Sequence, residues 1–205
     1  MKTTRNPSAE DRALAIFHRH GGMLRTVEAL DLGIHPRTLY ALRDQGRLDA
    51  VARGLYRLAD LPPLAQPDLV AVASAVPKGV ICMVSALSFH GITTQIPHQV
   101  DLALQRRGNI PKLQHPPLRI FWFSGPAFHE GVEHHEFDGI DVPIYSAPKT
   151  VADCFKYRNK IGLDIAIEAL RLCRRHRKAT VDELMHYADI CRVANIMRPY
   201  LEAML

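Results

Sequence analysis

Residues 34–58 read IHPRTLYALRDQGRLDAVARGLYRL, and this stretch decides the fold of the N-terminal part of the chain. Pro36 suits the first position of a helix, where its missing N–H leaves no helical hydrogen bond unmade. Leu39 and Leu42 lie three residues apart and therefore share the inward face of that helix. The two short apolar-alternating runs that follow flank an Arg-Gly pair at 53–54, which predicts a β-hairpin.

Two further helices are expected before this stretch. Ser8 is a suitable N-cap for the first, which ends at Gly21. The second covers TVEALDLG (26–33), with Val27 and Leu30 expected to point inward. Helix, short helix, helix and hairpin is the order of a winged helix-turn-helix, in which the third helix lies in the DNA major groove.

The outward face of the third helix is basic. With Leu39 inward, a rotation of about 100° per residue puts Arg37 and Tyr40 on the opposite face, with Arg43 beside them. Arg37 also lies in the N-terminal turn, the part of a recognition helix that meets base edges. Phosphate contacts are expected from side chains nearer the packed side, the hairpin and the start of the second helix: Arg25, Thr38, Arg53 and Arg57. The same features also fit a small helical module that binds a protein partner.

Composition supports a polyanionic partner modestly. The 205 residues contain 26 Lys and Arg, most of them Arg, against 21 Asp and Glu, and the net charge is +5. The planar guanidinium of arginine matches phosphate and guanine edges better than an ammonium does. No apolar run is long enough to cross a membrane, and the N-terminus lacks a secretory signal, so a cytoplasmic protein is expected. The four cysteines have no metal-binding spacing, and neither metal nor cofactor is implied.

After a proline-rich connection at 61–67, the pattern changes to a mixture of strands and helices. Strands are expected at 80–84 (VICMV), 98–104, 118–123 and 132–145, the last folded into a hairpin at Asp138-Gly139. Helices are expected at 68–76, from Ser85 to Gly91, at 149–159, at 163–177 and from Thr180 to the end. Ser85 is a suitable N-cap for the second of these, and Thr180 and Glu183 have the spacing of a capping box. The expected fold class is α+β, with a winged helix-turn-helix over residues 1–62. A mixed α/β domain over 63–205 then has a central sheet and a helical C-terminal part.

The residues do not favour an enzyme. The histidines of 129–136 alternate along a predicted strand, so His134 and His135 cannot converge on one metal ion. Lys149 follows a proline but lacks the glycines of a phosphate loop, and we expect it to be solvated or salt-bridged. An enzyme acting on nucleotides through a cryptic site stays open as an alternative.

The chain resembles the AbiEi-type antitoxins of bacterial type IV toxin–antitoxin systems. The stretches that carry the resemblance are GMLRTVEALDLGIHPRTLYALRDQGRLDAVARGLYRL (22–58), LVAVASAVPKGVICMVSALSFHGITTQIP (69–97), YSAPKTVADCFKYRNKIGLDIAIEALR (145–171) and ADICRVANIMRPYLEAML (188–205). The resemblance implies a winged-helix repressor of its own operon that binds inverted repeats. It further implies a C-terminal domain that neutralises a nucleotidyltransferase-like toxin without forming a stable complex with it.

The resemblance also implies candidate residues for both roles. The implied DNA contacts are Arg37, Thr38, Tyr40, Arg43 and Arg53. The implied antitoxin function lies in the stretch that contains Lys149, Asp153, Lys156, Arg158 and Lys160. The basic run that ends the predicted helix at 163–177 adds Arg174 and Arg175 as candidates, although a solvated helix end explains most such runs.

Overall fold

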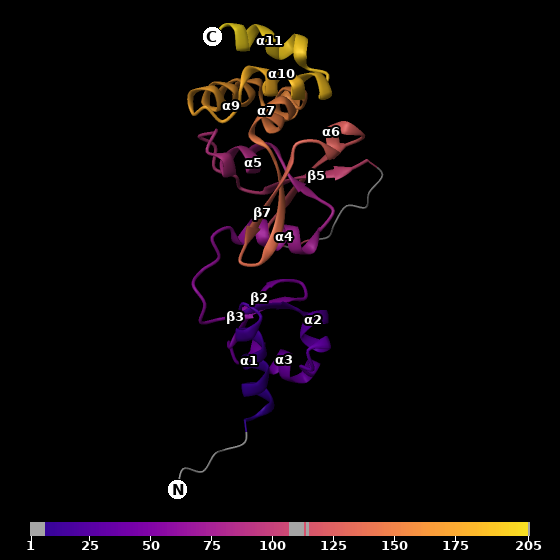
Figure 1. Cartoon of the computed structure of the whole chain (residues 1–205), viewed down its shortest axis with the longest axis vertical. Helices are drawn as coiled ribbons and strands as arrows, with labels where there is room; N and C mark the ends of the chain where they lie inside the picture. The colour runs from indigo at the N-terminus through magenta and orange to yellow at the C-terminus, as the bar shows by residue number, and fades with distance from the viewer. Residues whose placement is uncertain (1–6, 107–112, 114, 205) are drawn as a thin grey trace. The chain divides into compact units, whose positions relative to one another are not determined.

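A computed structural model describes residues 7–106, 113 and 115–204, and its combination of helices and mixed sheets confirms the α+β class. Contacts divide the chain into two compact units (Figure 1). The first contains the residues up to Ala75 together with Glu136–Asp141, and the second contains Val76–His135 and the residues from Val142. The expected domain boundary at 62/63 falls in the connection before the last helix of the first unit, and the expected outer limits at residues 1 and 205 lie outside the described residues.

The first unit combines helices with a small antiparallel sheet. Its elements are α1 (Ala9–Arg19), β1 (Met23–Arg25), α2 (Thr26–Asp31), α3 (Pro36–Asp44), β2 (Leu48–Ala52), β3 (Leu55–Leu58) and α4 (Pro67–Ala75). The sheet order is β1-β3-β2, and both pairings are antiparallel. The predicted hairpin is therefore confirmed, with Gly54 at its turn in the left-handed region at φ +74°.

The first helix begins where the sequence predicts. Ser8 Oγ accepts a hydrogen bond from the Asp11 N–H at 3.0 Å, and the Asp11 carboxylate accepts one from the Ser8 N–H at 3.0 Å. This reciprocal cap satisfies two helix-terminal donors. The helix then buries Ala13, Leu14 and Phe17 against α3 and the sheet, which places the core of this unit between helices and strands.

The prediction that Val27 and Leu30 of α2 point inward is wrong. Val27 is 68% exposed and Leu30 is 39% exposed, while Ala29 is fully buried. The helix has six residues, so its sequence contains too few turns to distinguish one face from another. Ala29 and the following Ile34 supply the packing that was assigned to the two larger side chains.

The second unit contains a five-stranded mixed sheet and most of the helices. Its elements are β4 (Val80–Ile81), α5 (Met83–His90), β5 (Val100–Gln105), β6 (Leu118–Phe123), α6 (Pro126–His129), β7 (Val132–Phe137), β8 (Ile140–Tyr145), α7 (Ala147–Lys156), α8 (Arg158–Ile161), α9 (Leu163–Arg175), α10 (Val181–Ile190) and α11 (Ala194–Glu202). The strand order is β6-β5-β4-β8-β7; β5 pairs parallel with β6 and antiparallel with β4, and β4 pairs parallel with β8. Figure 1 shows α7, α9, α10 and α11 gathered at one end of this unit, beyond the sheet.

Two expectations near the start of this sheet are corrected. The predicted strand VICMV is a strand only at Val80–Ile81, because the chain turns into α5 at Met83. Ser85 does not cap that helix. The cap is supplied by Asp101 from β5, whose carboxylate accepts the Val84 N–H at 3.0 Å, while the Ser85 hydroxyl accepts the Asp101 N–H at 2.9 Å.

The C-terminal helices follow the sequence closely. Thr180 Oγ1 accepts the Glu183 N–H at 3.2 Å and the Glu183 carboxylate accepts the Thr180 N–H at 2.7 Å, which confirms the predicted cap of α10. Leu170, Leu184 and Met197, from α9, α10 and α11, are fully buried in the core of this unit. Across the described part of the chain, none of the helices has the length and apolarity that a bilayer span requires.

Candidate nucleic-acid interface

Helix α3 exposes one polar face because its other face is fully buried. Leu39 and Leu42 have no exposed surface, so the side of the helix opposite them faces solvent. Pro36 stands at the first helical position as predicted, and the Arg37 N–H donates to Nδ1 of the N-cap residue His35 at 3.2 Å. Arg37 itself is exposed at the N-terminal turn. The helix therefore presents a cation at the end that carries the positive pole of its dipole, where an anion is stabilised.

Tyr40 and Arg43 lie side by side on the same helix. Tyr40 is 42% exposed, and the Arg43 guanidinium carbon lies 5.2 Å from the centre of its ring. The Arg43 Nη2 atom also pairs with Asp44 Oδ1 at 2.6 Å, and this carboxylate raises the pKa of Arg43. A carboxylate and an aromatic ring therefore both contact the guanidinium, which stays charged.

The turn of the β2–β3 hairpin is fastened to the start of α2. The Gly54 carbonyl oxygen accepts hydrogen bonds from the Thr26 N–H at 2.8 Å and from the Thr26 hydroxyl at 3.3 Å. Arg53, at the same turn, is exposed. These bonds fix the backbone from which the Arg53 side chain projects, so a cation is presented at the tip of the hairpin.

Two expected phosphate contacts are occupied within the protein. Arg57 is only 8% exposed, and its Nη2 atom donates to the Pro62 carbonyl at 2.6 Å. This corrects the sequence-based placement of Arg57 on an exposed hairpin surface: all four residues of β3 are buried, because the strand lies between β1 and β2. Arg25 is half-buried and its Nη1 atom donates to the Ser74 carbonyl at 3.0 Å. Thr38 is half-buried, as expected for a residue near the packed side of α3.

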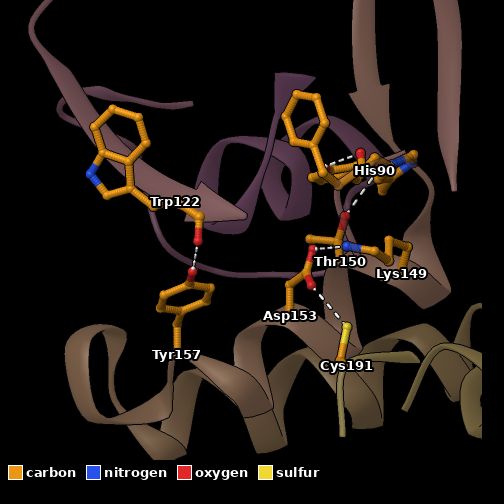
Figure 2. Close-up of polar contacts among 9 residues, drawn as sticks. His90, Trp122, Lys149, Thr150, Asp153, Tyr157 and Cys191 are labelled. Carbon is orange, nitrogen blue, oxygen red and sulfur yellow. Dashed lines mark hydrogen bonds and ion pairs between the residues drawn. The ribbon is translucent and has the colours of Figure 1, made fainter. Parts of the chain in front are cut away.

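Lys149 and Asp153, two candidates for the antitoxin function, form a fully buried ion pair. The Lys149 Nζ atom lies 2.5 Å from Asp153 Oδ2, one helical turn away on α7, and neither side chain has exposed surface. Figure 2 shows this pair beside Cys191, whose Sγ donates to Asp153 Oδ1 at 3.1 Å. The ammonium also lies 3.9 Å from the centre of the Tyr145 ring. Lys149 is therefore salt-bridged but not solvated.

This pair lies in an apolar interior, where the neighbouring polar groups already have hydrogen-bond partners. Burial raises the pKa of the Asp153 carboxyl, and the Lys149 ammonium and the Cys191 thiol oppose that shift only in part. The Tyr145 carbonyl accepts from His90 Nε2 at 2.7 Å and from the Thr150 hydroxyl at 3.1 Å (Figure 2). Lys149 and Asp153 consequently make their contacts inside the protein, and their buried side chains do not reach a partner molecule.

The other candidates of this unit lie nearer the surface. Lys156 and Arg158 are half-buried, and the Arg158 Nη1 atom donates to the Phe155 carbonyl at 2.9 Å. Lys160 and Arg175 are exposed. Lys160 and Arg175 therefore remain the candidates whose charge is most open to a partner.

Sequence reasoning missed one buried pair in the sheet of the second unit. Asp101 is 1% exposed, and its two carboxylate oxygens accept from Arg119 Nε at 2.7 Å and Nη2 at 2.8 Å. The available signal was an aspartate inside the apolar strand HQVDLAL, because a carboxylate is buried there only when it is paired.

Neither the histidines nor the cysteines form a metal cluster in the described residues. All four cysteines are free and buried: Cys82, Cys154, Cys173 and Cys191. Burial raises the pKa of each, to about 11 for Cys173, so they remain protonated near neutral pH.

Comparison with known proteins gives two findings. Residues 11–59 match the model of the family described as "Transcriptional regulator, AbiEi antitoxin", which confirms the resemblance seen in the sequence over this part of the chain. The crystal structure of the RV2827C protein from Mycobacterium tuberculosis superposes with a TM-score of 0.63 at 12% identity, covering 97% of this chain and 82% of that one. At this identity the likeness concerns the fold alone. Among curated proteins, no sequence matches.

Proposed function

We propose that this chain, whose residues 11–59 match the AbiEi antitoxin family of transcriptional regulators, is a DNA-binding repressor of its own operon that also serves as an antitoxin. The observation that carries the first role is the arginine face of α3. Arg37 and Arg43 lie on the exposed side of a helix whose opposite side is fully buried. A short positively charged helix face of this kind fits the major groove, where arginine pairs with guanine.

The arrangement around α3 supports a winged helix-turn-helix. Helices α1, α2 and α3 are combined with the three-stranded sheet β1-β3-β2, and the β2–β3 hairpin supplies the wing. In such a module the third helix contacts bases and the wing contacts the backbone. Arg37, Tyr40 and Arg43 are the proposed groove contacts, and Arg53 is the proposed phosphate contact. Thr38 and Arg25 are half-buried and are secondary candidates, and Arg57 is left out because it is buried.

The test is a titration of the full chain against its own upstream DNA, followed by gel shift or fluorescence anisotropy at several salt concentrations. Arg37→Ala is expected to cost about 1–3 kcal/mol on the operator, with little effect on unrelated DNA. Arg53→Ala is expected to weaken binding to every sequence alike and to lower the salt slope by about 1. Arg19→Ala removes the same charge from the exposed surface of α1 and is the matched control.

Binding by Arg37→Ala and Arg53→Ala that equals the parent at every salt concentration contradicts the DNA-binding assignment. An equal loss in all three variants, Arg19→Ala included, shows attraction by net charge alone and contradicts the assignment to α3 and the hairpin.

For the second role, we propose that the second unit neutralises a nucleotidyltransferase-like toxin without a stable complex. The test is co-expression of the full chain with the product of the neighbouring reading frame, with growth as the readout. Charge reversal at the two exposed candidates, Lys160→Glu and Arg175→Glu, is expected to reduce the rescue of growth while the operator is still repressed. Full rescue by the double variant removes these residues from the proposal.

A protein-interaction module is the second candidate function, and the exposed apolar residues of α2 favour it. Val27 and Leu30 of α2, and Leu32 directly after it, are 68%, 39% and 39% exposed, and exposed apolar side chains of this kind are available for a protein contact. Val27→Ser with Leu30→Ser distinguishes the two candidates: it leaves operator binding unchanged if α3 and the hairpin bind DNA alone.

A further inference from the structure

Two adjoining cavities lie in the second unit, near the turn between α9 and α10. The larger has a volume of about 600 Å³ and the smaller about 360 Å³, and both are lined by Lys178 and Glu183. Together they have the size range of small-molecule sites in proteins. All of their lining residues belong to the same unit.

The smaller cavity is lined by three cations. Arg174, Arg177 and Lys178 contribute to its wall. Within the described residues, no ion pair or side-chain hydrogen bond engages any of these three side chains, and Arg174 Nε is buried without a partner. Three unpaired cations in one wall attract an anionic ligand, and guanidinium groups pair well with phosphate oxygens.

The acidic residue of this cavity does not neutralise these cations. The Glu183 carboxylate accepts hydrogen bonds from the Thr180 N–H at 2.7 Å and from the Thr180 hydroxyl at 2.8 Å, and these bonds lower its pKa. Its charge is therefore balanced by the N-terminal end of α10. The positive charges of Arg174, Arg177 and Lys178 remain available for a ligand.

The larger cavity is aromatic and polar instead. His90, His186 and Tyr187 supply rings to its wall, and Glu133 and Asp182 supply carboxylates that accept hydrogen bonds. Ser146 is 7% exposed, and its buried hydroxyl has no hydrogen-bond partner in the described part of the chain. This oxygen has almost no accessible surface, whereas the Glu133 and Asp182 side chains in the same wall are exposed.

His90 lines the same cavity, and one of its two ring nitrogens is already hydrogen-bonded. Its Nε2 atom lies 2.7 Å from the Tyr145 carbonyl oxygen, which can only accept, so Nε2 carries the proton. Burial lowers the pKa of His90, which keeps the ring neutral near pH 7 and leaves Nδ1 as an acceptor. Rings for stacking and acceptors for amino and hydroxyl groups are what a nucleoside requires.

We propose that the two cavities form one nucleotide-binding site, with phosphate between Arg174, Arg177 and Lys178 and the nucleoside against His186 and Tyr187. A free phosphate ion would use only the smaller cavity, and an uncharged aromatic ligand only the larger. A nucleotide joins an anion to an aromatic base over both. The source of the nucleotide is either a free molecule or the phosphorylated end of an RNA strand, since both contain the same chemical groups.

The probe is ATP that bears a fluorescent N-methylanthraniloyl group on its ribose, titrated with the full chain and followed by anisotropy. Unlabelled ATP, GTP, CTP, UTP, pyrophosphate and a short 5′-phosphorylated RNA are the competitors. Displacement by nucleotides at lower concentration than by pyrophosphate is expected, because pyrophosphate lacks the groups that would fill the larger cavity. Stronger competition by the RNA identifies a strand end as the source, weaker competition identifies a free nucleotide, and either result supports the site.

Arg177→Gly is the decisive variant. Arg177 has a φ of +52°, a region that glycine adopts without strain, so the substitution removes the charge while the melting temperature stays equal to that of the parent or rises. It is expected to weaken probe binding about tenfold or more, the typical loss on removing a hydrogen bond to a charged group. Arg171→Ala, an exposed arginine of α9 that lines neither cavity, is the matched control and is expected to change binding less than about twofold.

Tyr187→Leu tests the nucleoside end. It keeps an apolar side chain in the core and is expected to weaken ATP without affecting pyrophosphate. The proposal is overturned if none of the four nucleotides nor the RNA displaces the probe, or if Arg177→Gly and Arg171→Ala bind alike. Equal competition by ATP and pyrophosphate, unchanged by Tyr187→Leu, also overturns the nucleotide assignment, because phosphate alone then accounts for binding.

Discussion

Replacing Lys149 by methionine tests whether the buried ion pair of α7 is structural. Methionine has similar length and leaves no polar group behind, but it leaves the Asp153 carboxylate buried with only the Cys191 thiol as a donor. An uncompensated buried carboxylate takes up a proton instead of staying charged. An aspartate has an ordinary pKa of 3.8, so keeping Asp153 protonated at pH 7 lowers the free energy of unfolding by at most about 4 kcal/mol.

The expected pH dependence follows from the same proton. Lys149 is one of the groups that lower the pKa of Asp153, so its removal raises that pKa further above the value in the unfolded chain. Between the pKa of Asp153 in the unfolded chain and its pKa in the folded variant, the folded variant holds one proton more than the unfolded chain. Its stability therefore falls as pH rises, by up to about 1.4 kcal/mol per pH unit. Lowering the pH from 7 to 5 should therefore restore up to about 3 kcal/mol in Lys149→Met relative to the parent.

The measurement is urea unfolding at both pH values, followed by tryptophan fluorescence. Trp122 is the single tryptophan of the sequence and lies on β6, so the signal reports on the second unit. Lys160→Met, at an exposed position, is the matched control and should change stability by less than about 0.5 kcal/mol. Combining Lys149→Met with Asp153→Asn should abolish the added pH dependence. A Lys149→Met variant as stable as the parent at pH 7, or destabilised equally at both pH values, refutes the reasoning.

Four shorter predictions concern caps, turns, core and thiols. Thr180→Ala should destabilise the second unit by about 1 kcal/mol in the same fluorescence assay, because it removes the cap of α10, and no change at all would contradict the capping role. Gly54→Ala, at φ +74°, should lower stability by about 1 kcal/mol and weaken DNA binding through the displaced hairpin; binding equal to the parent counts against a role for that turn. Leu39→Ala, fully buried, should cost about 2–5 kcal/mol by circular dichroism at 222 nm, and a cost below about 1 kcal/mol would show that α3 is loosely packed. The four buried cysteines should react with a thiol reagent only after denaturation, and rapid reaction of the native chain would contradict their burial.

Local signals in the sequence were sufficient to locate several elements of the first unit. The cap at Ser8, Pro36 at the start of α3 and the glycine of the hairpin turn each act within a few residues, so the sequence alone locates them. The same holds for the Thr180 cap in the second unit. The orientation of α2 was not predictable in this way, because six residues give no reliable periodicity.

Non-local contacts explain the remaining errors. The run VICMV is equally apolar as strand or helix, and the choice depends on Asp101, which caps α5 from a distant strand. The spacing of Lys149 and Asp153 indicates a salt bridge, but its burial depends on α9, α10 and α11 closing over α7. The cavities of the second unit likewise combine residues from separate elements, so no short motif marks them.

Cys191 follows the last residue of α10, and its thiol reaches back to Asp153 on α7. Shortening the chain ahead of residue 191 would leave the carboxylate of α7 facing water on the side that the final helices now cover. The smallest fragment suited to studying the antitoxin role by itself must consequently keep these last two helices, even though none of the residues predicted for that role lies within them.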